Sequence, residues 1–216
     1  MSLRSCLLMS LGLAALAGSS VRADTANALQ QYLNGLHSLR TEFTQTVTDA
    51  KGQELEHGSG VLVIERPDRF RWAYTPQSGD ATSTQLLVAD GKNLWFLDQD
   101  LAQATVKPQS EALSATPVVL LSGTDEELRS AFSIDGAPPR DGLQWVVVTP
   151  RSASAEFSRA QLGFQGPQLL TMLVDDRLGQ TVRLSFSNSE RNPALHGSNF
   201  QFTLPKGVDL IGTPRT

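Results

Sequence analysis

The sequence is poor in the residues that carry most metal and redox chemistry. It has one cysteine and three histidines in 216 residues. Cys6 is the lone cysteine, which excludes a disulfide within the chain and a site built from several thiolates. His37, His57 and His196 are scattered without the spacing of metal ligands. We therefore expect no metal site and no cofactor.

Catalytic patterns are missing as well. The Gly-Ser-Gly sequence at 58–60 is not the five-residue nucleophile elbow of hydrolases, and no glycine-rich loop fits a phosphate. The acidic residues at 125–127 fit a helix amino terminus, where the helix dipole favours negative charge, and those at 175–176 fit an exposed turn. These patterns predict that the protein is not an enzyme.

No hydrophobic run is long enough to cross a membrane as a helix. The apolar stretch at 6–17 is about a dozen residues, whereas a membrane-spanning helix needs about 20. Arg4 precedes the stretch, and Val21 and Ala23 are small residues where a signal peptidase requires them. We expect residues 1–23 to be a cleaved secretory signal peptide.

The charge balance excludes a further class of partners. The chain carries 22 acidic and 18 basic residues, and cleavage would remove Arg4 and Arg22 but no acidic residue. An acidic chain of this kind does not resemble a nucleic-acid-binding protein. No cysteine follows the cleavage point, so we expect an exported protein without a lipid anchor. Residues 24–216 fit one domain.

The first part of that domain is predicted to be helical. Leu29, Leu33 and Leu36 recur at spacings of four and three, which places them on one face of a helix over 24–39. Polar residues occupy the other face. The helix is therefore expected to cover an apolar surface on one side and to meet water on the other.

From residue 41 the hydrophobic period changes to two, which is typical of strands. Phe70, Trp72 and Tyr74 then fall on one face of a strand. Some ten or eleven antiparallel strands are predicted, and a sheet of that size must curl or close. The candidate strands are 41–48, 53–64, 69–74, 85–89, 93–97, 102–107, 143–148, 155–164, 169–175, 180–187 and 198–204.

The strand pattern is interrupted at about 110–132. This stretch is apolar and contains Pro117, and Thr124 with Glu127 fits a helix capping box. It is too apolar for a surface loop, so we expect a helical insertion that covers the sheet. The pattern does not decide whether the aromatic side chains beneath it form a filled core or the wall of a ligand cavity.

Five segments resemble the outer-membrane lipoprotein carrier family (LolA). The sequence at 63–72, VIERPDRFRW, resembles the strand, Arg-Pro turn and aromatic strand of that family. The sequence at 88–96, VADGKNLWF, resembles the hairpin that follows it. The segments 43–45, 116–117 and 202–208 agree in order and spacing. The resemblance thus spans nearly the whole chain after residue 23.

The resemblance implies a mainly β fold, a single half-open antiparallel β-barrel of about 10–11 strands with an α-helical lid. It implies a hydrophobic cavity that shields the acyl chains of lipoproteins. A periplasmic carrier of this family receives acylated lipoproteins from an ATP-driven inner-membrane ABC transporter complex and delivers them to an outer-membrane acceptor. We expect a monomer and a transfer without cofactors.

The resemblance also assigns roles to particular residues. Arg66, in the Arg-Pro turn, would bond to the lid helices and keep the empty cavity shut. The residues of the lid and cavity would be Leu29, Leu33, Leu36, Phe43, Phe70, Trp72, Leu94, Phe96, Val118, Leu120 and Leu121.

Two alternatives remain. One is a periplasmic module of the same half-barrel fold that senses lipid or lipoprotein, although such sensors usually carry an additional domain. The other is an ordinary β-barrel enzyme or small-molecule binder with a filled core, although the absence of catalytic patterns argues against the enzyme. The stretch 76–84 is longer than usual for the carrier family, and the tail 209–216 carries little pattern.

Overall fold

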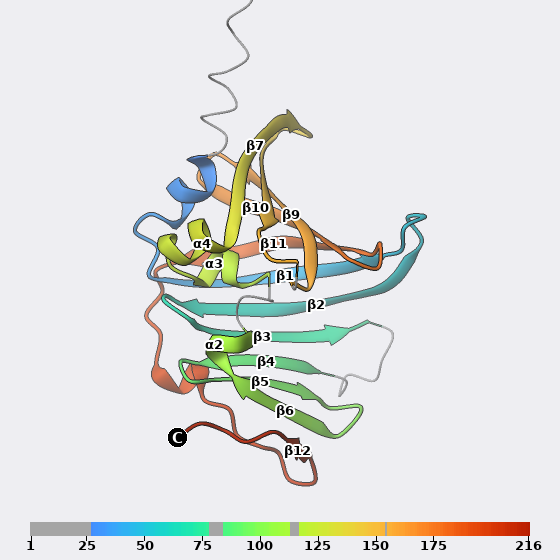
Figure 1. Ribbon diagram of the computed structural model, residues 1–216, viewed down its shortest axis with the longest axis vertical. Coiled ribbons are helices and arrows are strands. Elements are labelled where there is room, and N and C mark those ends of the chain that lie inside the picture. Colours follow the sequence, from blue (N-terminus) through green and yellow to red (C-terminus); the bar gives the residue numbers. More distant parts are fainter. Residues whose placement is uncertain (1–26, 78–83, 113–116, 154) are drawn as a thin grey trace, which may run out of the picture.

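The protein is a single curled sheet with short helices against one face (Figure 1). The computed structural model describes residues 27–77, 84–112, 117–153 and 155–216. This architecture confirms the predicted mainly β, half-open fold with a helical lid. The expected signal peptide, most of the stretch 76–84 and Thr116 lie outside the described residues.

The described strands and helices follow one another along the chain as follows. The strands are β1 (Ser38–Thr48), β2 (Glu54–Glu65), β3 (Arg69–Pro76), β4 (Gln85–Asp90), β5 (Asn93–Asp98), β6 (Gln103–Pro108), β7 (Phe132–Arg140), β8 (Leu143–Pro150), β9 (Phe157–Gln165), β10 (Gln168–Asp176), β11 (Thr181–Arg191) and β12 (Asp209–Ile211). The helices are 27–33, α2 (Gln109–Ala112), α3 (Val119–Ser122), α4 (Asp125–Ala131) and the 3₁₀ helix η2 (Gly197–Phe200).

All twelve strands belong to one sheet, in the order β12-β6-β5-β4-β3-β2-β1-β11-β10-β9-β8-β7. Neighbours are antiparallel except for β12, which pairs with β6 in parallel. Because β12 and β7 stand at the two ends of this order, the sheet is not closed in the described part of the chain. Figure 1 shows the consequence of its coiling: β2 to β6 run across the view, whereas β7 runs steeply.

The concave face of the sheet carries the main core. Phe43, Leu62 and Phe70 are fully buried there, together with residues of the helices 27–33, α3 and α4. We call these three helices and the turns between them the lid. Gly60 permits this packing, because a side chain at that position would overlap the ring of Phe43 and the carbonyl oxygen of Ala73.

The convex face of β3 to β6 is covered by the carboxyl-terminal segment 193–216. Val88 and Phe200 are buried between them, and the rings of Trp95 and Phe202 stack with centroids 4.7 Å apart. Further along, the side chain of Asn93 accepts a hydrogen bond from the Arg215 amide at 2.7 Å and donates one to its carbonyl oxygen at 3.1 Å. The tail is thus a structural layer of the domain.

One predicted strand was wrong, and two strands were missed. The alternation at 198–204 fits a strand, but Phe200 and Phe202 reach the convex face from η2 and an irregular segment whose backbone joins no ladder. Conversely, β7 was missed because Gly136 and the prolines at 138 and 139 obscure its pattern. Proline is tolerated there because β7 is an edge strand. The tail also supplies β12, which the sequence did not indicate.

Both predicted helical regions are shorter than expected. The first helix ends at Leu33 rather than at residue 39, because Gly35 takes a positive φ of 66° and starts the turn into β1. Leu36 therefore lies in the turn. The insertion predicted at 110–132 contains α2, α3 and α4, and β7 already begins at Phe132. The capping box of Thr124 and Glu127 is confirmed.

Candidate functional site

An apolar cavity of about 210 Å³ lies between the concave face of the sheet and α3. Leu62 and Trp72 form part of its floor, and Pro117, Val118 and Leu121 form its cover on the lid side. The remaining lining residues come from β1, β3, β4, β10 and β11, namely Gln45, Tyr74, Gln85, Leu87, Met172, Val174, Val182, Leu184 and Phe186. The curled sheet is therefore not completely filled by its own side chains.

Three polar side chains interrupt this apolar lining: Gln45, Tyr74 and Gln85. Tyr74 is only 1% exposed, and its hydroxyl oxygen is covered by the backbone of Gly58 and lies near the side chains of Glu56 and Gln45. Burial raises the pKa of Tyr74 well above its usual value, a hydrogen bond to the Glu56 carboxylate and its negative charge raise this pKa further, and the Gln45 amide opposes them. The hydroxyl is therefore neutral and carries its proton at physiological pH.

The structure distributes the predicted lid and cavity residues over three locations. Trp72, Val118 and Leu121 line the cavity, whereas Leu29 and Leu33 line a second hollow of about 260 Å³ beside α4. Phe96 on β5 pairs with Leu87 of β4, which lines the cavity, and so lies on the same face of the sheet, but Phe96 is 39% exposed. The other predicted residues pack in or against the core around the cavity: Leu36, Phe43, Phe70, Leu94 and Leu120.

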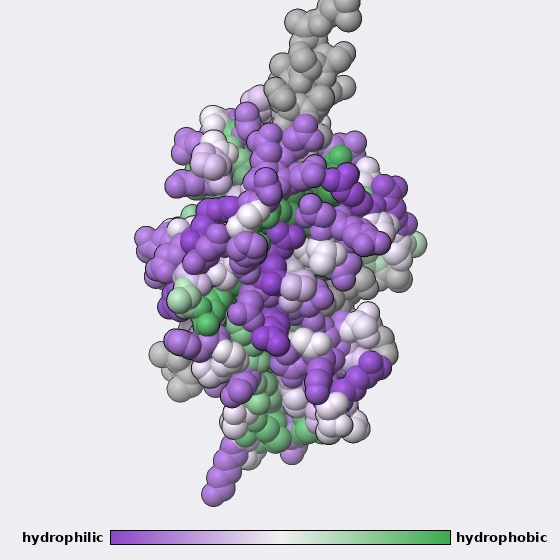
Figure 2. Space-filling model, turned by 90° about the vertical axis from the view of Figure 1, so that its left-hand side faces the viewer, coloured by the Kyte–Doolittle hydropathy of each residue, from purple (hydrophilic) through white to green (hydrophobic). Residues whose placement is uncertain are grey.

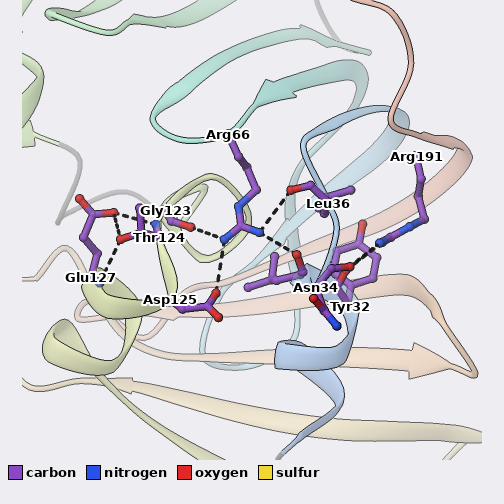
Figure 3. Close-up of polar contacts among 10 residues, drawn as sticks. Tyr32, Asn34, Leu36, Arg66, Gly123, Thr124, Asp125, Glu127 and Arg191 are labelled. Atoms are coloured by element: carbon purple, nitrogen blue, oxygen red, sulfur yellow. Dashed lines mark hydrogen bonds and ion pairs between the residues drawn. The ribbon is translucent and has the colours of Figure 1, made fainter.

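Arg66 joins two separate parts of the lid (Figure 3). Its Nη1 donates to the carbonyl oxygen of Leu33 at 2.8 Å and, at 3.4 Å, to that of Leu36. Its Nη2 donates to the carbonyl oxygen of Gly123 at 2.7 Å and lies 3.5 Å from Asp125 Oδ1. The guanidinium thereby satisfies carbonyl groups at the end of the first helix and at the end of α3, where intrahelical partners are lacking.

The turn that carries Arg66 makes a second connection to the lid. The amide of Asp68 donates to the carbonyl oxygen of Ser122 at 3.2 Å, and Gln109 Nε2 donates to the carbonyl oxygen of Asp68 at 2.7 Å. Asp68 Oδ1 is buried without a hydrogen-bond partner in the described chain. Burial, and to a lesser extent the charge of Glu127, raise the pKa of Asp68 above its usual value.

Two residues at the end of β11 also hold the first helix, and sequence reasoning missed both. Arg191 Nη1 donates to the carbonyl oxygen of Tyr32 at 2.9 Å, and the guanidinium lies 4.9 Å from the Tyr32 ring centroid. Asn192 Oδ1 accepts from the His37 amide at 2.8 Å, and its Nδ2 donates to Gly35 at 2.9 Å. Figure 3 shows Arg191 on the side of the helix away from Arg66. Backbone carbonyl partners of this kind leave no sequence signal.

The side of the molecule at the left of Figure 1 presents mostly hydrophilic side chains, with hydrophobic ones gathered in a narrow band in the lower half of the view (Figure 2).

Among the described residues no cluster of His, Asp or Glu could hold a metal ion. No helix in the same residues has the length and apolarity to cross a membrane. The candidate site is therefore the apolar cavity with its hydrogen-bonded lid.

Comparison with known families gives one match to most of the chain. The family model described as outer membrane lipoprotein carrier protein LolA matches residues 34–203. This range includes the Arg66 turn, the lid from residue 34 onward and every residue that lines the cavity.

Similar proteins carry the same description. An outer-membrane lipoprotein carrier protein from Methylobacillus flagellatus is 36% identical over 89% of this chain and 91% of its own length. One from Chromobacterium violaceum is 40% identical over 93% of this chain and 91% of its own. The crystal structure of a LolA superfamily protein from Nitrosomonas europaea superposes with a TM-score of 0.48 at 10% identity, covering 82% of this chain and 97% of that one.

Proposed function

The chain belongs to the LolA family of outer-membrane lipoprotein carriers, and we propose from this premise that it carries acylated lipoproteins through the periplasm. It would receive them from an ATP-driven inner-membrane release complex and deliver them to an outer-membrane acceptor. Residues 1–23 would be removed on export. Relatives named as carriers match over nine-tenths of their length, which supports a carrier rather than a sensor with a further domain.

The observation that carries this proposal is the cavity of about 210 Å³ under α3. Its lining is mostly apolar, and burial of each methylene of an acyl chain contributes roughly 0.8 kcal/mol. About ten methylenes would therefore contribute on the order of 8 kcal/mol. Binding of this strength without covalent chemistry is what a carrier requires.

Release requires a competing state, and the lid provides it. With no cargo bound, Val118 and Leu121 cover the space that an acyl chain would fill. Arg66 stabilises this closed arrangement through its bonds to Leu33 and Gly123. The free energy of closure is subtracted from the binding energy of the lipid, so cargo can be passed to an acceptor with a better site.

Filling the cavity tests the proposal directly. Val182 lines the cavity from β11, and Val182→Phe would place a ring in the free volume. Val147, on β8, lies outside the core cluster, so Val147→Phe is a matched control. We expect Val182→Phe to keep the midpoint of thermal unfolding while losing at least tenfold in affinity for an acylated peptide, and Val147→Phe to change neither quantity.

Native mass spectrometry of protein purified from the periplasm shows whether a lipoprotein is bound and whether residues 1–23 have been removed. A bound acylated polypeptide and a mass lacking residues 1–23 are the expected result. Full acyl-peptide binding by Val182→Phe, with its fold intact, would show that the cavity does not hold the cargo.

A further inference from the structure

A row of side chains on the concave face continues from the cavity to the edge strand β12. In the register of the sheet, Trp72 pairs with Leu87, and Leu87 pairs with Phe96. Phe96 pairs with Thr105, which pairs with Ile211 of β12. Paired residues on neighbouring strands project to the same face of a sheet. These five residues therefore form one line across β3, β4, β5, β6 and β12, which we call the concave row.

The lid covers only the first part of the concave row. Trp72 and Leu87 line the cavity, whereas Phe96 is 39% exposed and Ile211 is 51% exposed. In Figure 1, α3 and α4 lie over the upper part of the sheet, and β5, β6 and β12 lie further down. The exposed apolar side chains of the row thus continue the floor of the cavity.

Polar side chains flank the exposed part of the row. On one side Asp98 pairs with Gln103, which pairs with Asp209. On the other side Lys107 shares the face of Thr105, because side chains alternate along β6. A stable protein interface needs a contact of about 1,000 Å² or more, which an apolar strip one residue wide does not provide. The strip fits a single hydrocarbon chain.

The dimensions of the sheet indicate how much of a chain the cavity can hold. Strands lie about 4.8 Å apart, so the cavity floor from Leu62 to Leu87, two strand intervals, is roughly 10 Å long. The concave row from Trp72 to Ile211 has four intervals and is roughly 19 Å long. An acyl chain spans half of a bilayer core of about 30 Å, or about 15 Å. A full chain laid across the strands therefore extends beyond the cavity onto Phe96.

We propose that an acyl chain of the cargo lies across the strands along the concave row, with its free end under α3 and its linked end at β12. The inference rests on the proposed function, because it assumes that the cavity holds acyl chains. Val118 and Leu121 cover the inner end, whereas the outer end bears polar side chains such as Gln103. Phe96 and Ile211 thereby determine the chain length that binds best.

The test varies the acyl chain and keeps the peptide constant. Affinities of the mature exported protein are measured by calorimetry for one peptide carrying an octanoyl, a dodecanoyl or a palmitoyl chain. We expect the double variant with Phe96→Ser and Ile211→Ser to bind the palmitoyl peptide about tenfold more weakly, as for roughly two methylenes that lose an apolar contact. Binding of the octanoyl peptide should stay unchanged, because its chain fits within the cavity.

Leu210 provides the matched control. It is 40% exposed and lies on the same short strand, but it pairs with Ala104 and projects to the opposite face of the sheet. Leu210→Ser should leave the affinities for all three peptides unchanged. An equal loss with Leu210→Ser would assign the effect to β12 as a strand and overturn the role of the concave row.

Fluorescence tests the direction of the chain. A bromine atom on the chain quenches a tryptophan that it contacts, and Trp72 lines the cavity whereas Trp95 stacks on Phe202 at the convex face. We expect bromine at the free end of the palmitoyl chain to quench more strongly than bromine beside the carbonyl. Trp72→Phe should abolish this difference. The opposite order of quenching would overturn the proposed direction.

Thermal unfolding separates binding from stability. Phe96 and Ile211 are both more than a third exposed, so the double variant should unfold at nearly the wild-type temperature. Equal losses for the octanoyl and palmitoyl peptides would overturn the inference. If the wild type binds none of the peptides, the proposed carrier function fails; if it binds them and the double variant keeps the preference for palmitoyl, only the role of the concave row fails.

Discussion

Replacement of Arg66 by leucine should convert the protein into a carrier that loads but releases slowly. The variant removes every bond between the Arg66 turn and the carbonyl groups of Leu33 and Gly123. Leucine can occupy the mostly buried site, where the arginine side chain is 13% exposed. We therefore expect the fold to persist while the closed state of the lid loses stability.

The bond lengths set the size of the effect. The bonds to Leu33 and Gly123, at 2.8 and 2.7 Å, are short, and a bond to a charged donor contributes about 1.5–3 kcal/mol. The contact with Asp125 is 3.5 Å long and its carboxylate side chain is 55% exposed, so it adds less than about 1 kcal/mol. Loss of either short bond breaks the Arg66 link between the two parts of the lid. One such bond corresponds to about a 10- to 150-fold change in the ratio of closed to open protein.

Transfer kinetics measure this change. Wild type and variant are loaded with the same fluorescent acylated peptide, and its appearance on an excess of acceptor or lipid vesicles is followed over time. We expect the Arg66→Leu variant to release the peptide about tenfold more slowly or worse, because lid closure no longer competes with the lipid.

Arg66→Lys is the informative control. Lysine keeps the positive charge but lacks the planar fork that reaches both carbonyl groups, so its release rate should lie between those of wild type and leucine variant. Wild-type release by a folded Arg66→Leu protein would refute the role of Arg66 in closing the lid.

Two further predictions concern the other contacts of the lid. Arg191→Leu should lower the free energy of unfolding in urea by about 1–2 kcal/mol, since it frees the first helix from β11, yet change release of the peptide little because the Arg66 link remains. Equal effects of Arg191→Leu and Arg66→Leu on release would contradict the assignment of stability to Arg191 and of release to Arg66. For Asp68, whose pKa is raised in the folded protein, the native state binds the proton more tightly, so stability is highest below the unfolded pKa and falls as pH rises through the folded value. Asparagine suits the positive φ of 68°, so Asp68→Asn should raise the unfolding temperature at pH 7 and lose this advantage near pH 3. An unchanged unfolding temperature at pH 7 would show that the ionised carboxylate does not destabilise the folded protein.

Much of the sheet could be predicted because local chemistry determines it. The Asp90-Gly91 pair and the flanking alternation located the β4–β5 hairpin correctly, and the capping box located the start of α4. The elements that were missed or misassigned depend on distant contacts. β12 forms on the exposed edge of β6, and Phe202 is held by the ring of Trp95 rather than by strand pairing.

The site shows the same division. Alternation placed Trp72 and Tyr74 on one face, and the Arg-Pro turn singled out Arg66. The partners of Arg66 are backbone oxygens, which every residue possesses, so no pattern could identify them. Whether the space between sheet and lid is empty depends on the volumes of residues from seven segments of the chain. Periodicity assigns such residues to a face but does not sum their volumes.

The two outermost strands bear on how copies of this protein meet one another. Any half-open sheet leaves backbone donors and acceptors at its margins, where a second molecule could add a strand. Here one margin is β12, only three residues long, and the other is β7, interrupted by a bulge and by the prolines at 138 and 139. Neither offers a continuous ladder, so we expect both margins to resist the addition of a strand from a second copy.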